Sequence, residues 1–218
     1  MRKTLIEVKD MHIGHGGKIL YNGICFNINE GDCIMLCGAN GSGKTTLLKT
    51  LANTYENIAM IPTRIPKIAG FTALEFVRIS CFMQSDIGGR LSDNEERSLK
   101  AALAKLGISH LASRDISTLS DGEFQKAGIA AAIARKASVI LLDEPTAFLD
   151  VENRIAVLDS IRQICDTASS SSAVIFSTHD LTEGLQYANK VFALGADGIF
   201  HTSSDDLKSA VQTIFRKS

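Results

Sequence analysis

The chain has no tryptophan, three prolines, three tyrosines and a formal net charge of −1 over 218 residues. A net charge so close to zero disfavours a protein that binds nucleic acid through a broad basic face, because that mode depends on many contacts to phosphates. No stretch approaches the roughly 20 apolar residues that a membrane-spanning helix needs. The N-terminal residues also lack the apolar core of a secretory signal, so we expect a cytoplasmic protein that meets a membrane only through a partner.

The sequence also lacks a framework for disulfides or structural metals. The five cysteines form no C-x-x-C pair, and Cys33 and Cys37 lie in an apolar run. We therefore expect reduced, buried cysteines that pack as small hydrophobic side chains, and no zinc or iron–sulfur site. The apolar fraction of 45% and charged fraction of 22% are typical of a globular protein with a sizeable core.

The sequence does contain an α/β pattern that is interrupted by a helical stretch. Four early strands and three later ones are predicted, and two of the later ones are continuous apolar runs, as expected for parallel strands covered on both faces. The expected strands are 5–8, 24–28, 33–37, 58–61, 139–143, 173–177 and 190–194. The expected helices are 44–52, 71–80, 94–106 with Asp93 as its N-cap, 123–136, 151–168, 181–188 and 205–215. We predict one domain over residues 1–218, with a helical insertion at about 64–116.

A phosphate-binding loop follows the strand at 33–37. The sequence matches G-x-x-x-x-G-K-[ST] between a strand and a helix, which is the context that this motif requires. Backbone N–H groups of such a loop and the start of its helix point at phosphate oxygens. Lys44 is expected to contact the β- and γ-phosphates, and Thr45 offers a hydroxyl to Mg²⁺. The predicted ATP-binding residues here are Gly38, Ala39, Asn40, Gly41, Ser42, Gly43, Lys44, Thr45 and Thr46.

Two adjacent acids, Asp143 and Glu144, end the strand at 139–143. Ligands bind at the carboxyl ends of parallel strands, and two neighbouring carboxylates repel each other without a cation. Asp143 is therefore predicted to hold Mg²⁺, directly or through water. Glu144 is the candidate to polarise the attacking water as general base.

Three further stretches resemble the ABC ATPase family. Residues 119–126 (LSDGEFQK) resemble its signature sequence, residues 146–150 (TAFLD) its D-loop, and residues 177–180 (STHD) its switch histidine. The order and spacing agree, and the resemblance covers nearly the whole chain. It implies an α/β P-loop NTPase fold of the RecA-like kind, with a mostly parallel sheet, a small antiparallel β subdomain and a helical subdomain.

The resemblance also implies how the site works. His179 would contact the γ-phosphate and position the water, beside Lys44 and Glu144. Two copies would close head to tail over two ATP molecules, so that the signature of one copy completes the site of the other. The residues expected to act in trans are Ser120, Gly122, Glu123 and Asp150.

The chain departs from the family pattern at three places. Thr63 stands where the family usually has a glutamine that helps to bind Mg²⁺ and water and couples to the membrane subunit. The stretch from Lys44 to Thr63 is short, which predicts a reduced antiparallel subdomain. An adenine-stacking aromatic is missing; His15 stands near its place and Tyr21 is an alternative. Since Lys44 and both acids are retained, hydrolysis is predicted to be retained.

The leading hypothesis is an ATP-hydrolysing subunit that energises import through integral membrane permease subunits. The local pattern is closest to ATPases of iron–siderophore, haem or cobalamin importers, in which a substrate-binding protein takes part indirectly. Such a subunit would be peripheral on the cytoplasmic face of the inner membrane, and no nucleic acid is expected as a partner. Two alternatives remain open: a regulatory or assembly module that binds ATP with little turnover, and a non-transport ABC ATPase.

Overall fold

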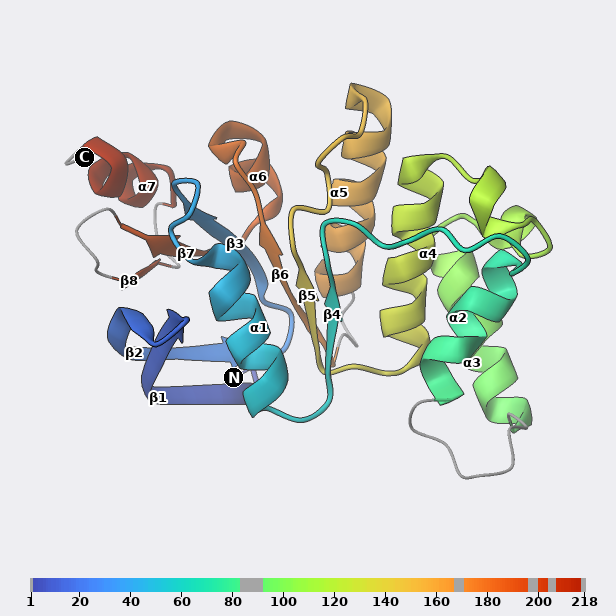
Figure 1. The fold of residues 1–218 in the computed structure, drawn as a ribbon, viewed down its shortest axis with the longest axis horizontal. Helices are drawn as coiled ribbons and strands as arrows, with labels where there is room; N and C mark the ends of the chain where they lie inside the picture. The colour runs from blue at the N-terminus through green and yellow to red at the C-terminus, as the bar shows by residue number, and fades with distance from the viewer. Residues whose placement is uncertain (1, 83–91, 167–170, 196–199, 204–206, 217–218) are drawn as a thin grey trace. The chain divides into compact units, whose positions relative to one another are not determined.

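The computed structural model describes residues 2–82, 92–166, 171–195, 200–203 and 207–216, and the chain forms two compact units (Figure 1). The first consists of residues 1–63, 138–145 and 161–218. The second consists of residues 64–137 and 146–160, so it is wider than the predicted insertion and includes the signature and D-loop stretches. Among the described residues, no helix has the length and apolar character needed to cross a membrane.

A six-stranded sheet forms the centre of the first unit, in the order β4-β5-β6-β3-β7-β8. The strands are β3 (Cys33–Gly38), β4 (Ile58–Ile61), β5 (Val139–Leu142), β6 (Ala173–Ser177), β7 (Lys190–Leu194) and β8 (Phe200–Ser203). The first five strands of that order are parallel, and β8 pairs with β7 in the antiparallel sense. Every residue of β5 and β6 is buried, as expected for central parallel strands. The predicted P-loop NTPase fold is confirmed.

A separate two-stranded antiparallel sheet is formed by β1 (Thr4–His15) and β2 (Lys18–Asn29). Both strands are longer than the sequence pattern predicted. His15 pairs with Lys18 across a two-residue turn, Gly16-Gly17, in which both residues have positive φ. Two such residues suit the tight turn that matches strand twist, and glycine adopts them at little cost. This hairpin is the reduced antiparallel subdomain that the short stretch after Lys44 predicted.

The helices of the first unit are α1 (Lys44–Thr54), α6 (Leu181–Tyr187) and α7 (Leu207–Arg216), together with the end of α5 (Val151–Asp166). Leu47, Leu48 and Leu51 of α1 are fully buried and join a core cluster with both sheets. The chain then passes from α1 into β4 through a short turn. The start of α1 is therefore packed firmly at the end of β3, where the phosphate-binding loop lies.

The second unit is helical. It contains α2 (Ala73–Phe82), α3 (Asp93–Lys105), α4 (Asp121–Ala134), two short 3₁₀ turns and the first ten residues of α5. The N-cap of α3 is Ser92 rather than the predicted Asp93: its hydroxyl accepts from Glu95 N, and the Glu95 carboxylate accepts from Ser92 N. The same reciprocal capping box starts α4 two residues earlier than predicted.

The cysteines follow the prediction in part. Cys33, Cys37 and Cys165 are buried, but Cys25 is exposed on the hairpin, so the expectation that all five are buried was wrong there. The side chain of Cys81 lies outside the described residues. Burial raises the pKa of the Cys37 thiol to about 12, which makes that side chain chemically inert near neutral pH.

Candidate functional site

The phosphate-binding loop connects β3 to α1. Gly43 is the N-cap of α1 with φ of 100°, a conformation that favours glycine, and no side chain caps the helix. The first turn of α1 contains no acidic residue. The unpaired N–H groups of this turn therefore face a hollow of about 560 Å³, a size typical of small-ligand sites. Its lining residues are Leu20, Asn40, Gly41, Gly43, Lys44, Thr45, Thr46, Glu144 and His179.

Lys44 is buried, and its ammonium group donates to the carbonyls of Gly38 at 2.8 Å and Ala39 at 3.2 Å. Burial lowers its pKa, and the nearby carboxylates of Glu144 and Asp143 act in the opposite direction. The loop thus holds a partly desolvated ammonium group at the floor of the hollow. Such a group interacts with an anion more strongly than a hydrated surface lysine does.

The two acids lie immediately after β5, in the same unit as the loop. Thr45 Oγ1 donates to Asp143 Oδ2 at 2.8 Å, and Ser177 Oγ donates to Asp143 Oδ1 at 2.9 Å. Glu144 has a left-handed backbone with φ of 50°, and its N–H donates to Ser177 Oγ at 2.8 Å. The sheet order explains this assembly: β6 lies between β5 and β3, so Ser177 at its end reaches the acids from the neighbouring strand.

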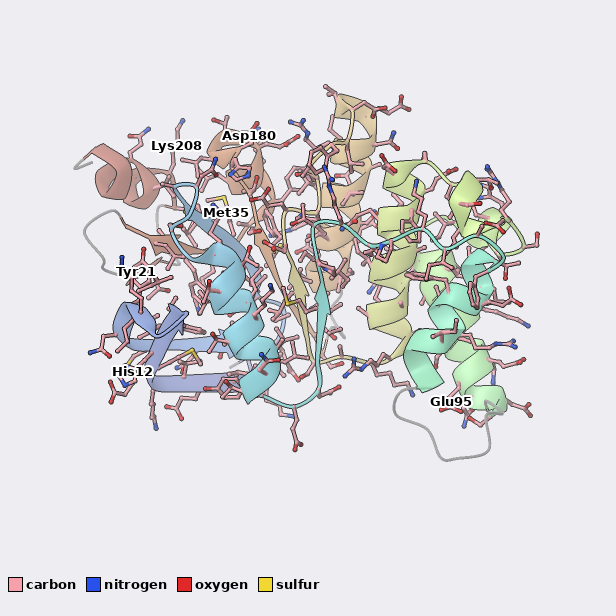
Figure 2. All side chains as sticks on the ribbon, viewed as in Figure 1. His12, Tyr21, Met35, Glu95, Asp180 and Lys208 are labelled. Carbon is pink, nitrogen blue, oxygen red and sulfur yellow. The ribbon has the colours of Figure 1, made fainter. Side chains whose placement is uncertain are left out.

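His179 comes from the segment that follows β6. Its Nε2 is 2.7 Å from Glu144 Oε1, while half of its side chain is exposed to the hollow. Asp180, labelled in Figure 2, caps α6 by accepting from Glu183 N at 2.9 Å, which fixes the chain direction just after the histidine. Three sequence-predicted residues, Lys44, Glu144 and His179, therefore line one hollow.

The oxygen atoms at this place suit a small divalent cation. Thr45 Oγ1 and Asp143 Oδ2 are neighbours, and hydroxyl and carboxylate oxygens are the hard donors that Mg²⁺ binds. Among the described residues, no group of three histidine, cysteine or acidic side chains could hold a metal on its own. That arrangement fits Mg²⁺, which usually keeps waters and takes its remaining ligands from substrate phosphates.

The two residues predicted to contact the adenine are Tyr21 and His15, and Tyr21 is not among the residues that line the hollow. Tyr21 (Figure 2) is 6% exposed, belongs to the hydrophobic core and donates its hydroxyl to Gly195 O at 3.1 Å. Its ring has no open face for a base, so the structure disfavours this assignment. His15 ends β1, and its side chain lies outside the described residues. Leu20, which sequence reasoning missed, is the large apolar side chain that lines the hollow.

In the helical unit, Ser120 is the N-cap of α4. Its hydroxyl accepts from Glu123 N at 3.2 Å, and Glu123 Oε2 accepts from Ser120 N at 2.8 Å. These hydrogen bonds, led by the one from the Ser120 backbone, lower the pKa of Glu123. Lys67 donates to Leu119 O at 2.8 Å and to Asp121 Oδ1 at 2.6 Å. The signature turn is thus tied down both within itself and by Lys67.

Gly122 and Asp150 meet through one side chain. A Cβ atom on Gly122 would lie 2.6 Å from Asn153 Oδ1. Asn153 is held by Asp150, whose two carboxylate oxygens accept from its backbone N–H at 2.8 Å and its side-chain amide at 3.0 Å. All four residues predicted to act in trans therefore belong to the second unit.

Thr63, half-buried, is not among the residues that line the hollow in the first unit.

Comparison with known proteins places this geometry in a family. A family model described as "ABC transporter" matches residues 21–147. The petrobactin import ATP-binding protein FpuD of Bacillus anthracis is 29% identical over 89% of this chain and 78% of its own length. The aliphatic sulfonates import ATP-binding protein SsuB 2 of Pseudomonas syringae pv. syringae (strain B728a) is 33% identical over 89% of this chain and 72% of its own length. A solved ABC transporter in an inward-facing conformation matches 98% of this chain and 90% of its own with a TM-score of 0.85 and 25% identity.

Proposed function

Because the chain belongs to the ABC transporter family and is an ATP-binding ATPase, we propose that it energises import of a small molecule through a membrane permease. The observation that carries the proposal is the convergence of Lys44, Thr45, Glu144 and His179 on one hollow in front of the start of α1. Lys44 and Thr45 come from the start of α1, Glu144 from the segment after β5 and His179 from the segment after β6, and no structural role requires these three places to meet. Such convergence is typical of a nucleotide hydrolysis site.

The phosphate end of the site follows from the loop. Backbone N–H groups at the start of α1 and the ammonium group of Lys44 bind the β- and γ-phosphates. Thr45 and Asp143 would hold Mg²⁺ with their adjacent oxygens. When bound, the ion would supply positive charge against the negative charge that develops during transfer.

Glu144 is the proposed general base. Its left-handed backbone and the hydrogen bond from its N–H to Ser177 direct its carboxylate toward the hollow, where it accepts the proton of the attacking water. His179, at 2.7 Å from the carboxylate, orients Glu144 and can reach the γ-phosphate. The products are ADP and inorganic phosphate.

A second copy of the chain completes the site in our proposal. The start of α4 supplies a second anion-binding helix start: the Ser120–Glu123 capping box uses the N–H groups of those two residues, and the N–H groups of Asp121 and Gly122 face the anion. Asp150 and the neighbouring exposed Phe148, 69% accessible, supply contact surface. Two copies related by a two-fold axis would enclose two ATP molecules head to tail, with Ser120, Gly122, Glu123 and Asp150 acting in trans.

The partners and location follow from the family. We propose that permease subunits bind the ATPase dimer at the cytoplasmic face of the inner membrane, and that a substrate-binding protein delivers the cargo. An iron–siderophore, haem or cobalamin cargo is favoured by the sequence at 119–123. Relatives are named for import of petrobactin and of aliphatic sulfonates, which are different kinds of cargo, so the choice of cargo is the most specific part of this proposal.

The test uses the isosteric substitution Glu144→Gln, with Glu56→Gln in the exposed turn after α1 as control. Loss of the base should lower the hydrolysis rate by about 10²–10⁴-fold while ATP still binds. Light scattering with Mg²⁺-ATP should then show a dimer for Glu144→Gln, and the control should behave as the wild type.

A second candidate, an ATP-binding regulatory module with little turnover, is favoured by Thr63 in place of the usual glutamine. Absence of Mg²⁺-dependent hydrolysis by the wild type, alone and with its permease, would replace our proposal by this one. A Glu144→Gln variant that binds ATP but stays monomeric would remove the head-to-tail dimer from the mechanism.

A further inference from the structure

Ser177 is a buried polar residue that opens the stretch at 177–180, in which only His179 has been given a role. It is the last residue of β6 and is 0% exposed. In the sheet it pairs with Leu36 of β3, one strand away from the acids that follow β5. A buried hydroxyl at the edge of a hydrolysis site, and not in contact with the hollow, raises the question of what it holds.

Its two hydrogen bonds join the two acids of the site. A serine hydroxyl has one donor and two acceptor positions. Ser177 Oγ uses the donor on Asp143 Oδ1 at 2.9 Å, and accepts from Glu144 N at 2.8 Å. One side chain on β6 therefore fixes the side chain of one acid and the backbone of the next.

The bond to Asp143 determines which carboxylate oxygen is available. Asp143 is 5% exposed, and its Oδ1 is occupied by Ser177, whereas Oδ2 meets Thr45. Carboxylates that bind metals are usually hydrogen-bonded on their other oxygen, and that partner sets their orientation. Without Ser177, the carboxylate could rotate, and Oδ1 would be a buried acceptor without this donor.

The bond to Glu144 supports an unfavourable backbone. A non-glycine residue in the left-handed region is strained, and it persists only where its surroundings hold it there. The N–H of Glu144 is held by Ser177 and its carboxylate by His179, so two residues that are close in sequence fix both ends of Glu144. Loss of the first contact would free the backbone that directs the carboxylate.

We propose that Ser177 is a positioning residue that orients Asp143 toward the metal and Glu144 toward the attacking water. The proposal rests on the roles given above to these two acids. Ser177 acts through them, since it does not line the hollow and its hydroxyl bonds to the two acids.

A purely structural role predicts something different: loss of stability without a change in metal dependence. Ser160 provides a matched control, because it is also a buried serine, 6% exposed, whose hydroxyl makes one hydrogen bond, to Ala156 O at 2.7 Å. Ser160 lies in α5, and its hydroxyl bonds within that helix rather than to either acid. Ser177→Ala and Ser160→Ala each remove a buried hydroxyl, but only the first should alter the chemistry.

The test has a binding readout and a kinetic readout. The affinity for a fluorescent ATP analogue is measured in EDTA and in Mg²⁺. The dissociation constant in EDTA divided by that in Mg²⁺ reports how much the metal strengthens binding. Ser177→Ala should lower this ratio about 10–100-fold, the range found when outer partners of metal ligands are removed, with unchanged affinity in EDTA. kcat should fall by a similar factor, KM for Mg²⁺-ATP should rise as Mg²⁺-ATP binding weakens, and Ser160→Ala should match the wild type in both.

Two further variants keep the test decisive. Ser177→Thr retains the hydroxyl and should restore most of the Mg²⁺ ratio, whereas Ser177→Cys, of similar size, is a weak donor and should not. If Ser177→Ala fails to fold, this pair carries the comparison. A Mg²⁺ ratio and kcat that match Ser160→Ala would overturn the positioning role. If the wild type fails to hydrolyse ATP, the proposed function fails, but the Mg²⁺ ratio still tests Ser177.

Discussion

Whether an alanine at position 122 stabilises or destabilises the protein depends on one neighbouring residue, Asn153. A Cβ atom at this position would lie 2.6 Å from Asn153 Oδ1, 2.8 Å from its Cγ and 2.9 Å from its Cβ. Real Cβ atoms do not approach this closely, so the start of α4 or the start of α5 must shift. We therefore predict that Gly122→Ala destabilises the helical unit.

Two effects of opposite sign set the magnitude. Replacing glycine by alanine in a helix gains about 0.5–1 kcal/mol, an upper limit here because Gly122 lies in the first turn. Overpacking a tight contact costs about 1–3 kcal/mol. The net change should be a loss of up to about 2.5 kcal/mol, and for a chain of this length each 1 kcal/mol lowers Tm by roughly 2–4 °C.

The assay is a double-mutant cycle with Asn153→Gly, followed by thermal and urea unfolding. Asn153→Gly removes all three atoms that the new methyl group meets. In that background, Gly122→Ala should become neutral or stabilising, because only the propensity gain is left. The reasoning is refuted if Gly122→Ala stabilises the wild type, or if its cost is the same in both backgrounds.

Three further predictions concern other parts of the chain. Lys67→Glu and Asp121→Lys should each weaken ATP-driven dimerisation, and the charge-swapped double variant should recover part of it, because the 2.6 Å ion pair ties the signature turn. Leu20→Ala should raise KM for ATP by less than about 60-fold with little change in kcat, since it removes three carbon groups of a half-buried side chain and each is worth about 0.8 kcal/mol when fully buried. In the folded protein at pH 8, iodoacetamide should label the exposed Cys25 within minutes and leave Cys37 unlabelled, as peptide mass mapping can show, because the pKa of Cys37 is about 12.

Strand and helix positions were predictable where one local signal dominated. The apolar runs at 58–61 and 173–177 coincide with β4 and β6, because buried parallel strands admit few polar residues. The two strands of the hairpin are longer than predicted. Their residues alternate between exposed and buried, which is a weaker signal than a continuous apolar run, and the Gly16-Gly17 turn is the feature of the sequence that marks where they meet. The starts of α3 and α4 were misplaced because Ser92 and Ser120, each followed by glutamate three residues later, are the better caps.

The residues of the site were predictable for a different reason. Motifs fix Lys44 and Glu144 by their place at strand ends, and parallel strands bring such ends to one edge of the sheet. The motifs do not say which side chain of a neighbouring strand faces them. Ser177 could have been noticed as a polar residue at the end of an otherwise apolar strand, but its partners depend on β6 lying between β5 and β3. The opposite error occurred at Tyr21, where the residue type suggested stacking and the alternation of β2 placed the ring in the core.

The reduced antiparallel sheet should affect binding of the base rather than hydrolysis. The residues that line the phosphate end of the hollow come from the loop after β3, from α1 and from the segments after β5 and β6. Their side-chain hydrogen bonds in the described part of the chain are made with one another, with the loop, with Asp143 and with Ser177, not with the hairpin. The hairpin contributes Leu20, which is apolar and cannot distinguish bases by hydrogen bonding. A chain that retains its parallel strands but has a small hairpin should therefore hydrolyse ATP and GTP at similar maximal rates, and its losses should appear in KM. A kcat that differs by more than about tenfold between the two nucleotides would show that the base is recognised during the chemical step, contrary to this division of the site.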